Sequence, residues 1–570
     1  MITKSINTLL TACLLCGSAV AALSSCSSMM ETESELVEFE KDNTLNHPTD
    51  SVYSVMGIIS KLQAIADRTV LLGEVRADLV QPTEAASADL KRLSAFDLQQ
   101  ANKYNQVSDY YAVVNNCNYY LAHVDTAMQR RGRNLFLPEY AVVKAYRAWT
   151  YLQLATTYGQ VPLVLTPVMT EQEAREAMNQ PRVALADVCQ YFINDLAPLA
   201  GVEQPQFGTI NDFESRQFFL PLKALLGDLC LWSGRYEEAA RWYHDYLTDV
   251  RRPVQMRSSN RITWASTSDL TRPVNGYTVT NPSEALSFIP MEQRVFDGTV
   301  SDLPNIFGST QQNNYYFQLK PSTAMSRLSA AQDYCFEVKT DVRTDTLYAP
   351  KTGFQDPLLT GDLRLYANYS LTTAGGRDPY SEYNYERQSI AKTASNMIIT
   401  YRRSMVYLRY AEALNRCRLP QSAMVVLKYG MCKENVATYV DSLEQKRAGE
   451  LIAFDDENLF SREQVRGIHS LGSGDSQANA HYTLPMPAAK LATLQDTIDY
   501  QVPLVEDMII NEMALEGAFE GYRFYDLMRV ALRRNDPAYL AMPVSQREGT
   551  ANEPLRSLLM DTRNWYLPLP

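Results

Sequence analysis

Cys26 is the residue whose surroundings most clearly predict a chemical modification. It follows 25 residues in which Lys4 is the only charged side chain and two short apolar runs are separated by small residues. A charged start, a short apolar core and an exit of small residues are typical of a secretory signal peptide. A membrane-spanning helix needs about 20 mostly apolar residues, and the serines and Gly17 interrupt this run. The pattern predicts that residues 1–25 are a signal peptide.

The four residues that end at Cys26 predict where the signal is cut and what happens to the thiol. Leu23, Ser24, Ser25 and Cys26 resemble a bacterial lipobox, in which the cysteine is acylated and becomes the new N-terminus. Two or more lipid signals anchor a protein stably, whereas one acyl chain holds it only marginally. The alternative is an ordinary signal peptide with an incidental cysteine. We expect lipidation, palmitate included, with this covalent lipid on Cys26 and no other cofactor.

The motifs that could support enzyme chemistry are weak. LGSGDS (471–476) is similar to the neighbourhood of some serine nucleophiles, but a nucleophile elbow needs a strand before the serine and a helix after it. The five histidines have no metal-ligand spacing. The clustered carboxylates of FDDEN (454–458) could bind calcium, but the segment lacks the pattern of an EF-hand loop, and a solvated acidic turn is the favoured alternative. A pair of carboxylates for glycoside cleavage can lie far apart in a chain, so that possibility stays open. We predict a protein that is not an enzyme and holds no metal.

Charge and cysteine spacing exclude further classes. The chain has 65 acidic and 53 basic residues, a net charge of −12, and no Lys/Arg block. Nucleic acid is therefore not an expected partner. The six cysteines after Cys26 form no C-x-x-C pair, which argues against zinc and redox motifs. We expect them to be free thiols, most of them buried on apolar helical faces.

Helices dominate the chain after residue 50. Apolar residues recur at helical spacing in segments that we predict to be helices or helical pairs: 51–68, 109–128, 138–159, 220–247, 402–431, 502–520 and 522–534. In 220–247 the turn falls at Ser233-Gly234, and the apolar pattern is similar to that of a tetratricopeptide hairpin. The pairs have no fixed period. The predicted fold class is mainly α, with irregular tetratricopeptide-like hairpins, long loop excursions and a few short strands.

Two polar insertions interrupt these helices. Residues near 250–400 are rich in Asn, Ser, Thr, Pro and Gly, with strand-like runs at 284–290 and 396–401, and residues 437–500 form a second polar stretch. Long loops between rigid helices commonly carry function. We therefore look for ligand contacts in the first insertion.

The expected organisation has three parts. Residues 1–25 are the signal peptide. Residues 26–50 contain five glutamates and form an acylated N-terminus with an acidic tether. Residues 51–570 form a single helical domain that carries both insertions.

Tyrosine is the most frequent aromatic residue, with 35 Tyr against 18 Phe and 5 Trp. A tyrosine ring with its polar tip suits a wet binding surface, and sugar rings present C–H faces that stack on such rings. QQNNYYFQ (311–318) combines aromatic rings with amides that suit sugar hydroxyls. The alternative is that most tyrosines pack helix against helix. The candidates for ligand binding in the first insertion are Trp264, Tyr277, Tyr315, Tyr316, Tyr380 and Tyr383.

Several separate motifs resemble those of SusD/RagB-type lipoproteins, in the same order and along nearly the whole chain. The segment 401–416 matches at Arg403, Leu408, Ala411, Glu412, Ala413 and Asn415. The segment 520–529 matches at Glu520, Gly521, Arg523, Asp526, Leu527 and Arg529. The early helix 144–164, GDLR at 361–364 and the terminal NWYLPLP also fit.

The resemblance implies a SusD-like fold and a lipid-anchored protein on the outer surface of a Bacteroidetes outer membrane. Such proteins cover a SusC-like, TonB-dependent transporter and capture nutrients, usually oligosaccharides, whereas the RagB-like branch handles peptides. A secreted helical glycosidase is the least favoured alternative. Most matched residues are expected to be architectural, and Arg523 and Asp526, three apart on a helix, can pair with each other or bond neighbouring backbone. The resemblance transfers no ligand-contacting residue.

Overall fold

The helices expected from the sequence are present in the computed structural model. It describes residues 48–99, 101–256, 261–264, 273–275, 277, 284–291, 300–308, 317–351, 361–373 and 386–569. His47–Pro570 form one unit of contacts. The described residues are mainly helical with a few short strands, as predicted. None of the described helices has the length and apolar character that a membrane span requires.

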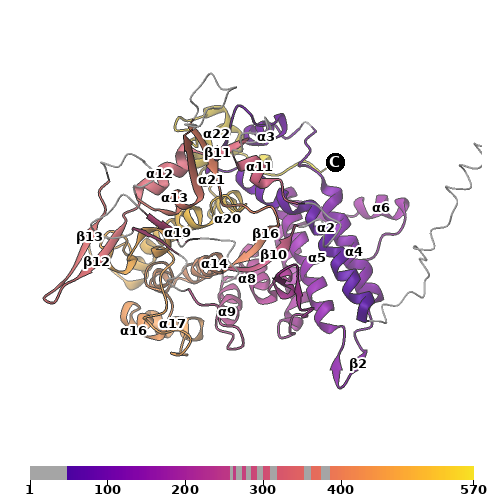
Figure 1. Ribbon diagram of the computed structural model, residues 1–570, viewed down its shortest axis with the longest axis horizontal. Coiled ribbons are helices and arrows are strands. Elements are labelled where there is room, and N and C mark those ends of the chain that lie inside the picture. Colours follow the sequence, from indigo (N-terminus) through magenta and orange to yellow (C-terminus); the bar gives the residue numbers. More distant parts are fainter. Residues whose placement is uncertain are drawn as a thin grey trace, which may run out of the picture. The chain divides into compact units, whose positions relative to one another are not determined.

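The described helices and strands follow one another along the chain as shown in Figure 1. The helices are α2 (Pro48–Glu74), α3 (Ala88–Ala95), α4 (Val107–His123), α5 (Leu137–Tyr158), α6 (Glu171–Met178), α7 (Leu185–Leu196), α8 (Leu222–Trp232), α9 (Tyr236–Leu247), α11 (Leu303–Phe307), α12 (Thr323–Ala331), α13 (Arg364–Asn368), α14 (Arg403–Arg416), α15 (Pro420–Met424), α16 (Lys433–Tyr439), α17 (Ser442–Ala448), α18 (Ser470–Ser473), α19 (Leu494–Gly517), α20 (Arg523–Arg534), α21 (Ala538–Ser545) and α22 (Glu553–Leu559). The strands are β1 (Val80–Pro82), β2 (Gln129–Arg130), β3 (Arg133–Asn134), β4 (Gln160–Pro162), β5 (Arg182–Ala184), β6 (Thr209–Ile210), β7 (Phe213–Glu214), β8 (Ile262–Trp264), β9 (Pro273–Asn275), β10 (Ala285–Pro290), β11 (Leu319–Pro321), β12 (Cys335–Lys339), β13 (Thr344–Tyr348), β14 (Tyr369–Thr373), β15 (Glu386–Ile390) and β16 (Met397–Arg402).

Helices α2, α4 and α5 pack side by side (Figure 1). Arg68, late in α2, donates hydrogen bonds to the Gln106 carbonyl and to Asp109 at the start of α4, so these two helices run antiparallel. The predicted apolar face of α2 is buried. Helix α4 ends at His123, five residues earlier than the periodicity predicts, because Val124 adopts an extended conformation.

The tetratricopeptide-like hairpin predicted over 220–247 is confirmed as α8 and α9. Its turn lies at Ser233-Gly234, and Gly234 has the positive φ of 78° that favours glycine. The two helices approach closely at Gly227. A Cβ at this position would lie only 2.5 Å from the Tyr243 ring, so a larger residue would clash with it. The Tyr243 hydroxyl donates a 2.6 Å hydrogen bond to Asp228, which fixes the pair further.

The two strand-like runs of the first insertion form one two-stranded antiparallel sheet, β10 with β16. The second insertion differs from its predicted loop character, because it contains α16, α17 and α18. Asp441 caps α17 through the amides of Leu443 and Glu444. The buried Glu444 carboxylate accepts hydrogen bonds from Ser422, so these short helices are tied to α15.

Predictions about single side chains had mixed outcomes. The six described cysteines are free thiols, and all except Cys417 are buried, as expected. Of the two contacts predicted for Arg523, the ion pair with Asp526 does not form, whereas Arg523 does donate to a backbone carbonyl, that of Ile510, at 3.2 Å. Arg523 instead forms a bidentate ion pair with Asp78 at 2.6 and 2.8 Å, and Asp526 accepts from Arg529 at 2.9 Å. Arg523 reaches Asp78 because α20 packs against α2, whose C-terminal end leads to that residue.

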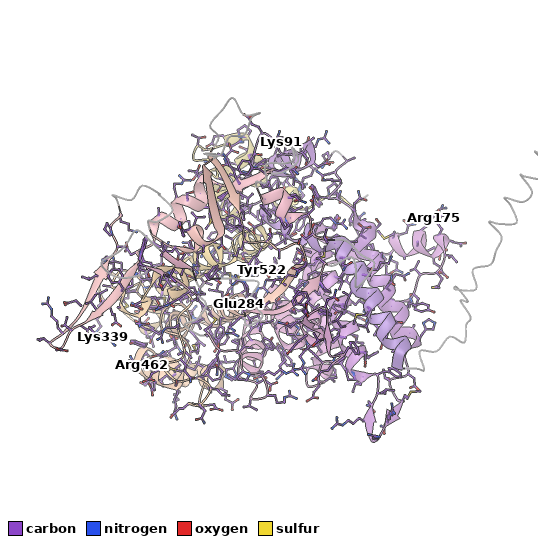
Figure 2. The ribbon with its side chains drawn as sticks, in the orientation of Figure 1. Lys91, Arg175, Glu284, Lys339, Arg462 and Tyr522 are labelled. Atoms are coloured by element: carbon purple, nitrogen blue, oxygen red, sulfur yellow. The ribbon has the colours of Figure 1, made fainter. Side chains whose placement is uncertain are left out.

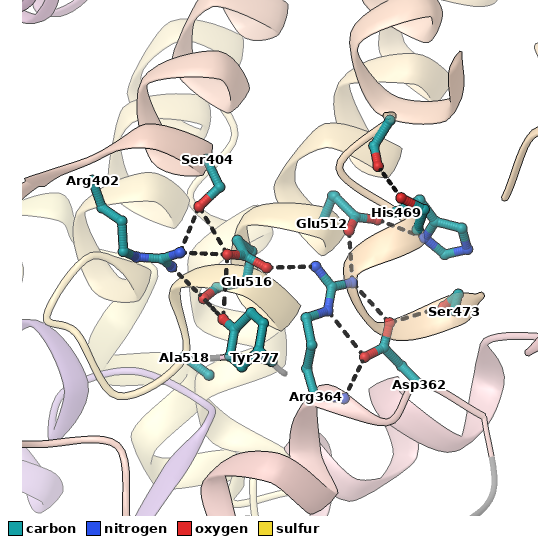
Figure 3. A network of polar contacts seen from close by, with 12 residues as sticks. Tyr277, Asp362, Arg364, Arg402, Ser404, His469, Ser473, Glu512, Glu516 and Ala518 are labelled. Carbon is teal, nitrogen blue, oxygen red and sulfur yellow. Dashed lines mark hydrogen bonds and ion pairs between the residues drawn. The ribbon is translucent and has the colours of Figure 1, made fainter. Parts of the chain in front are cut away.

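A buried ion-pair network centred on Glu516 joins β16, α13, α14 and α19 (Figure 3). One carboxylate oxygen of Glu516 accepts from Arg402 and from the Ser404 hydroxyl at 2.8 Å. The other accepts from Arg364 at 2.9 Å. The side chains of Glu516, Arg402 and Arg364 are all 0 % exposed.

The same arginine, Arg364, links Glu516 to a second carboxylate and to the segment before α13. It donates to Glu512 at 2.6 Å and forms a bidentate pair with Asp362. Glu512 also contacts His469 Nδ1 at 2.8 Å, and Asp362 accepts from Ser473 at 2.9 Å. Charges from four distant segments therefore satisfy one another in the interior.

Burial alone would raise the pKa of Glu516, but Arg402 and Arg364 offset burial and hold it at about 2. The carboxylate therefore stays charged at neutral pH. A buried charge that loses its partner is costly, so the network constrains all its members together.

We expect Arg364→Leu to lower the free energy of unfolding by about 3–5 kcal/mol, because the buried Asp362 loses its arginine partner and Glu512 and Glu516 each lose one of theirs. The matched control is Arg175→Leu, since Arg175 pairs with Glu171 where both side chains are at least 74 % exposed. That change should cost at most about 0.5 kcal/mol. Urea unfolding of the two variants is the measurement, and equal losses would contradict the role given to the network.

Candidate functional site

The structure places the predicted ligand-binding aromatics in two groups. Trp264 is 7 % exposed and Tyr277 is 3 % exposed, so neither ring presents a face to solvent. The Tyr277 hydroxyl contacts the Glu516 carboxylate at 3.2 Å, which makes this tyrosine part of the buried network. These two side chains therefore do not offer the exposed stacking surfaces that we predicted, because both are buried. Tyr315, Tyr316, Tyr380 and Tyr383 lie outside the described residues.

The weak serine motif LGSGDS and the acidic segment FDDEN occupy different environments. Ser473 is buried and donates to Asp362, and it ends the short helix α18, so the strand that an elbow requires does not precede it. Residues 455–458 of FDDEN are exposed, which fits the solvated acidic turn. Over the part of the chain that the structure describes, no group of three or more His, Cys, Asp or Glu residues could hold a metal ion.

A surface cleft of about 720 Å³ is the most suitable binding site among the described residues. Its walls come from the end of α5, strand β5, the α8–α9 turn, the end of α14, helix α20 and the C-terminal residues. We call it the aromatic cleft and define it by these side chains: Tyr158, Arg182, Trp232, Tyr236, Arg416, Arg529, Arg533, Arg563 and Tyr566. A cavity of this volume is within the size range of small-ligand sites.

Aromatic rings reach the cleft from three separate elements. Trp232, Tyr236 and Tyr566 are each partly exposed. Tyr566 lies directly over Gly159, where a Cβ would be 3.2 Å from the tyrosine ring. Gly159 also has φ 79° and ends α5, so it both stops the helix and leaves room for the ring.

Two buried carboxylates hold the arginines of the aromatic cleft in place. Glu412 of α14 accepts from Arg529 Nε at 3.0 Å and pairs with Arg416. Glu506 of α19 pairs with Arg416 Nε at 3.4 Å and with Arg533. Burial alone would raise the pKa of Glu412, but Arg416 and Arg529 hold it at about 2. The guanidinium groups are thus held from behind by charged carboxylates.

The lining of the aromatic cleft is strongly basic in an acidic protein. Its described lining contains five arginines and neither Asp nor Glu, whereas the whole chain has a net charge of −12. Arg182 is exposed, and among the described residues its side chain forms no ion pair. Guanidinium donors beside open ring faces can bind a polyhydroxylated ligand, with the rings stacking on C–H faces and the donors bonding to oxygens.

A smaller cavity of about 80 Å³ lies behind the cleft and shares Leu231, Trp232 and Arg529 with it. Tyr522, which lines this cavity, lies near the middle of the view in Figure 2, far from the exposed Arg175. The volume has room only for a few water molecules. Asp228, on its wall, already accepts from Tyr243, Tyr401 and Arg409.

Sequence reasoning missed the aromatic cleft. Trp232 and Tyr236 were recognised only as hairpin positions, and Tyr566 only as part of a terminal motif. The arginines lie on four elements that are far apart in sequence, so no local pattern marks them. The one available signal was the arginine-rich end of α20, which carries Arg529 and Arg533.

Comparison with known proteins supports the fold through solved structures alone. Neither protein-family models nor curated proteins match this sequence. A SusD superfamily protein from Bacteroides vulgatus aligns with a TM-score of 0.57 over 92% of this chain and 96% of its own, at 14% identity. A SusD homolog from Bacteroides thetaiotaomicron aligns with a TM-score of 0.53 over 94% and 96%, at 16% identity.

The chain has the SusD fold. A third similar structure is a SusD-like carbohydrate-binding protein from Bacteroides fragilis, with a TM-score of 0.52, 15% identity, and coverage of 86% of this chain and 87% of that one. The SusD fold accounts for the order of the helical hairpins. It places the end of α5 beside the chain's C-terminal residues, where Leu567 donates to the Thr157 carbonyl at 2.9 Å, and this contact builds one wall of the aromatic cleft.

Proposed function

We propose that this chain is a SusD/RagB-type cell-surface lipoprotein that binds an oligosaccharide and delivers it to a SusC-like, TonB-dependent transporter. The observation that carries the proposal is the SusD fold over nearly the whole chain, together with an exposed cleft that presents rings and donors. A binding surface of this kind needs no bond-breaking groups. Its energy would come from a few aromatic anchors.

The ligand class is supported from two directions. One of the similar structures, from Bacteroides fragilis, is described as a SusD-like carbohydrate-binding protein. In the aromatic cleft, Tyr566 and Trp232 come from different elements and leave ring faces partly exposed. The Arg529 guanidinium lies 5.3 Å from the centre of the Trp232 ring, a cation–π distance, so it packs over one face of that ring and leaves the other for a ligand.

A peptide is the second candidate ligand, and the arginines favour it. Arg182 and Arg563 are exposed on the cleft lining, with the Arg563 side chain 88 % exposed. Guanidinium groups bind carboxylates in a bidentate manner, as an acidic or C-terminal peptide group would require. The three partly exposed aromatic residues of the same cleft, Trp232, Tyr236 and Tyr566, favour the sugar, because stacking needs ring faces and carboxylate binding does not.

Anchoring at the outer membrane is the second part of the proposal. Cys26 would carry the acyl chains, and the acidic residues 27–47 would separate them from α2. We expect labelled palmitate to be incorporated into the natural chain and not into Cys26→Ser. Equal labelling of both chains, or of neither, would contradict lipidation at this residue.

The binding experiment compares two sites with one control. Trp232→Ala with Tyr566→Ala should weaken binding of any glycan found on an array by about tenfold or more, since each stacked ring contributes on the order of 1 kcal/mol. Tyr191→Ala with Tyr500→Ala removes two exposed rings outside the cleft and should change affinity less than about twofold. Tyr315→Ala with Tyr316→Ala tests the aromatic pair predicted from sequence.

The outcomes of this experiment distinguish between the two candidate sites. Loss in the Trp232/Tyr566 variant alone supports the aromatic cleft. Loss in the Tyr315/Tyr316 variant alone places the ligand at the predicted pair and contradicts the cleft. Release of shorter products from any bound glycan by the natural chain would contradict a purely binding function. Circular dichroism and thermal unfolding of each variant keep loss of fold distinct from loss of binding.

A further inference from the structure

A second cavity, on the other side of the α8–α9 hairpin from the aromatic cleft, contains arginines that lack counterions. It has a volume of about 360 Å³ and shares no lining residue with the aromatic cleft. Arg216, Arg252 and Arg403 all line it, together with the ring of Tyr246. We call it the arginine pocket and define it by these four residues.

The three arginines come from separate parts of the fold. Arg216 lies in a short 3-10 helix (Ser215–Phe218), Arg252 follows α9, and Arg403 is the first residue of α14. Arg403 is positioned by the buried network, since its amide donates to the Glu284 carbonyl at 3.0 Å and its neighbour Arg402 pairs with Glu516. The positions of the three arginines are therefore set by the elements that carry them and, for Arg403, by the buried ion-pair network.

Among the described residues, none of the three guanidinium groups has a carboxylate in contact with it; Arg216 and Arg403 are partly buried and Arg252 is exposed. Within the described part of the chain, the side chains of Arg216, Arg252 and Arg403 form neither an ion pair nor a hydrogen bond. The Nε atoms of Arg216 and Arg403 are buried without a hydrogen-bond partner. Buried polar donors are nearly always satisfied in native proteins, so these two atoms require an explanation.

The positive charges also act on one another. Burial lowers the pKa of Arg252 and the nearby Arg216 lowers it further, while Glu203 and Asp249 oppose this shift with smaller effects. Burial raises the pKa of Tyr246, and Arg252 and Arg403 oppose that rise, which places both arginines near the same hydroxyl. Like charges that are partly removed from water repel one another unless an anion lies between them.

The acidic residues of the pocket do not supply that anion. Glu203 and Asp249 are both paired with Arg251, whose side chain is 55 % exposed. Glu214 is exposed. The opposite wall is apolar, with Leu222 and Val254 at 7 % and 5 % exposed, and a low local polarity strengthens the attraction for a ligand charge.

We propose that the arginine pocket is an anion site that binds the compact oxyanion, a carboxylate, sulfate or phosphate, of a small ligand. Guanidinium groups donate paired hydrogen bonds to two oxygens of such a group, and three of them line this pocket. The site is separate from the aromatic cleft, so this inference does not depend on the proposed glycan function.

The test measures anion binding to the full mature chain by calorimetry and thermal unfolding at constant ionic strength. The probes are inorganic sulfate, inorganic phosphate, glucuronate and uncharged glucose, each against a chloride background. We expect at least one oxyanion to bind and to raise the unfolding temperature beyond the chloride value. Arg216→Gln with Arg403→Gln should weaken that binding by about tenfold or more, because each removes a charged donor.

The matched control is Arg175→Gln with Arg241→Gln, which removes two exposed arginines that pair within their own helices. It should change anion affinity by less than about twofold. Binding of glucuronate without free sulfate or phosphate would identify an acidic sugar as the source, and the reverse would identify a free inorganic anion. Either result supports the oxyanion site.

Two results would overturn the proposal. One is that no oxyanion stabilises the natural chain more than chloride does. The other is that the Arg216/Arg403 variant binds as tightly as the natural chain. The variant also has an internal check, because removal of mutually repelling charges should leave the unfolding temperature in chloride unchanged or higher.

Discussion

The carboxylate of Glu516 accepts from Arg402, Arg364 and Ser404 in a region from which water is excluded. A charge in that position is tolerable only while its partners are in place, because the cost of removing it from water is large. The partners belong to α13 and to the contiguous elements β16 and α14, which are distant along the chain from one another and from α19, the helix that carries Glu516. The need to keep the buried Glu516 carboxylate paired therefore fixes how these distant segments pack together, independently of the conformation of the insertions between them.

The binding features depend on the same frame. Helix α14 begins at Arg403, which faces the arginine pocket, and ends at Arg416, which lines the aromatic cleft. Helix α19 supplies both Glu516 to the central network and Glu506 to the arginines of the cleft. The protein therefore positions two surface sites with one buried set of charges, while the sites themselves are free to carry different side chains.

The sequence predicted the helices of the fold better than it predicted the binding sites. Hydrophobic spacing located α2, α5, α8 and α9 because apolar residues recur in them at helical intervals. Gly159 marks the end of α5, and Ser233-Gly234 marks the turn between α8 and α9. Ion pairs such as Arg523 with Asp78 join residues 445 positions apart, so spacing along one helix pointed to the wrong partner. The cleft was missed for the same reason: Tyr566 faces Gly159 only after folding.

Hydrogen exchange with and without a bound glycan tests the central claim most directly, since it locates the ligand on the intact chain. Binding in the aromatic cleft should slow exchange at residues 158–160, 231–236 and 562–566 and leave the amides around Glu516 unchanged, because the frame is already formed. Protection confined to another surface, or new protection throughout α14 and α19 on binding, would contradict a preformed cleft on a rigid frame.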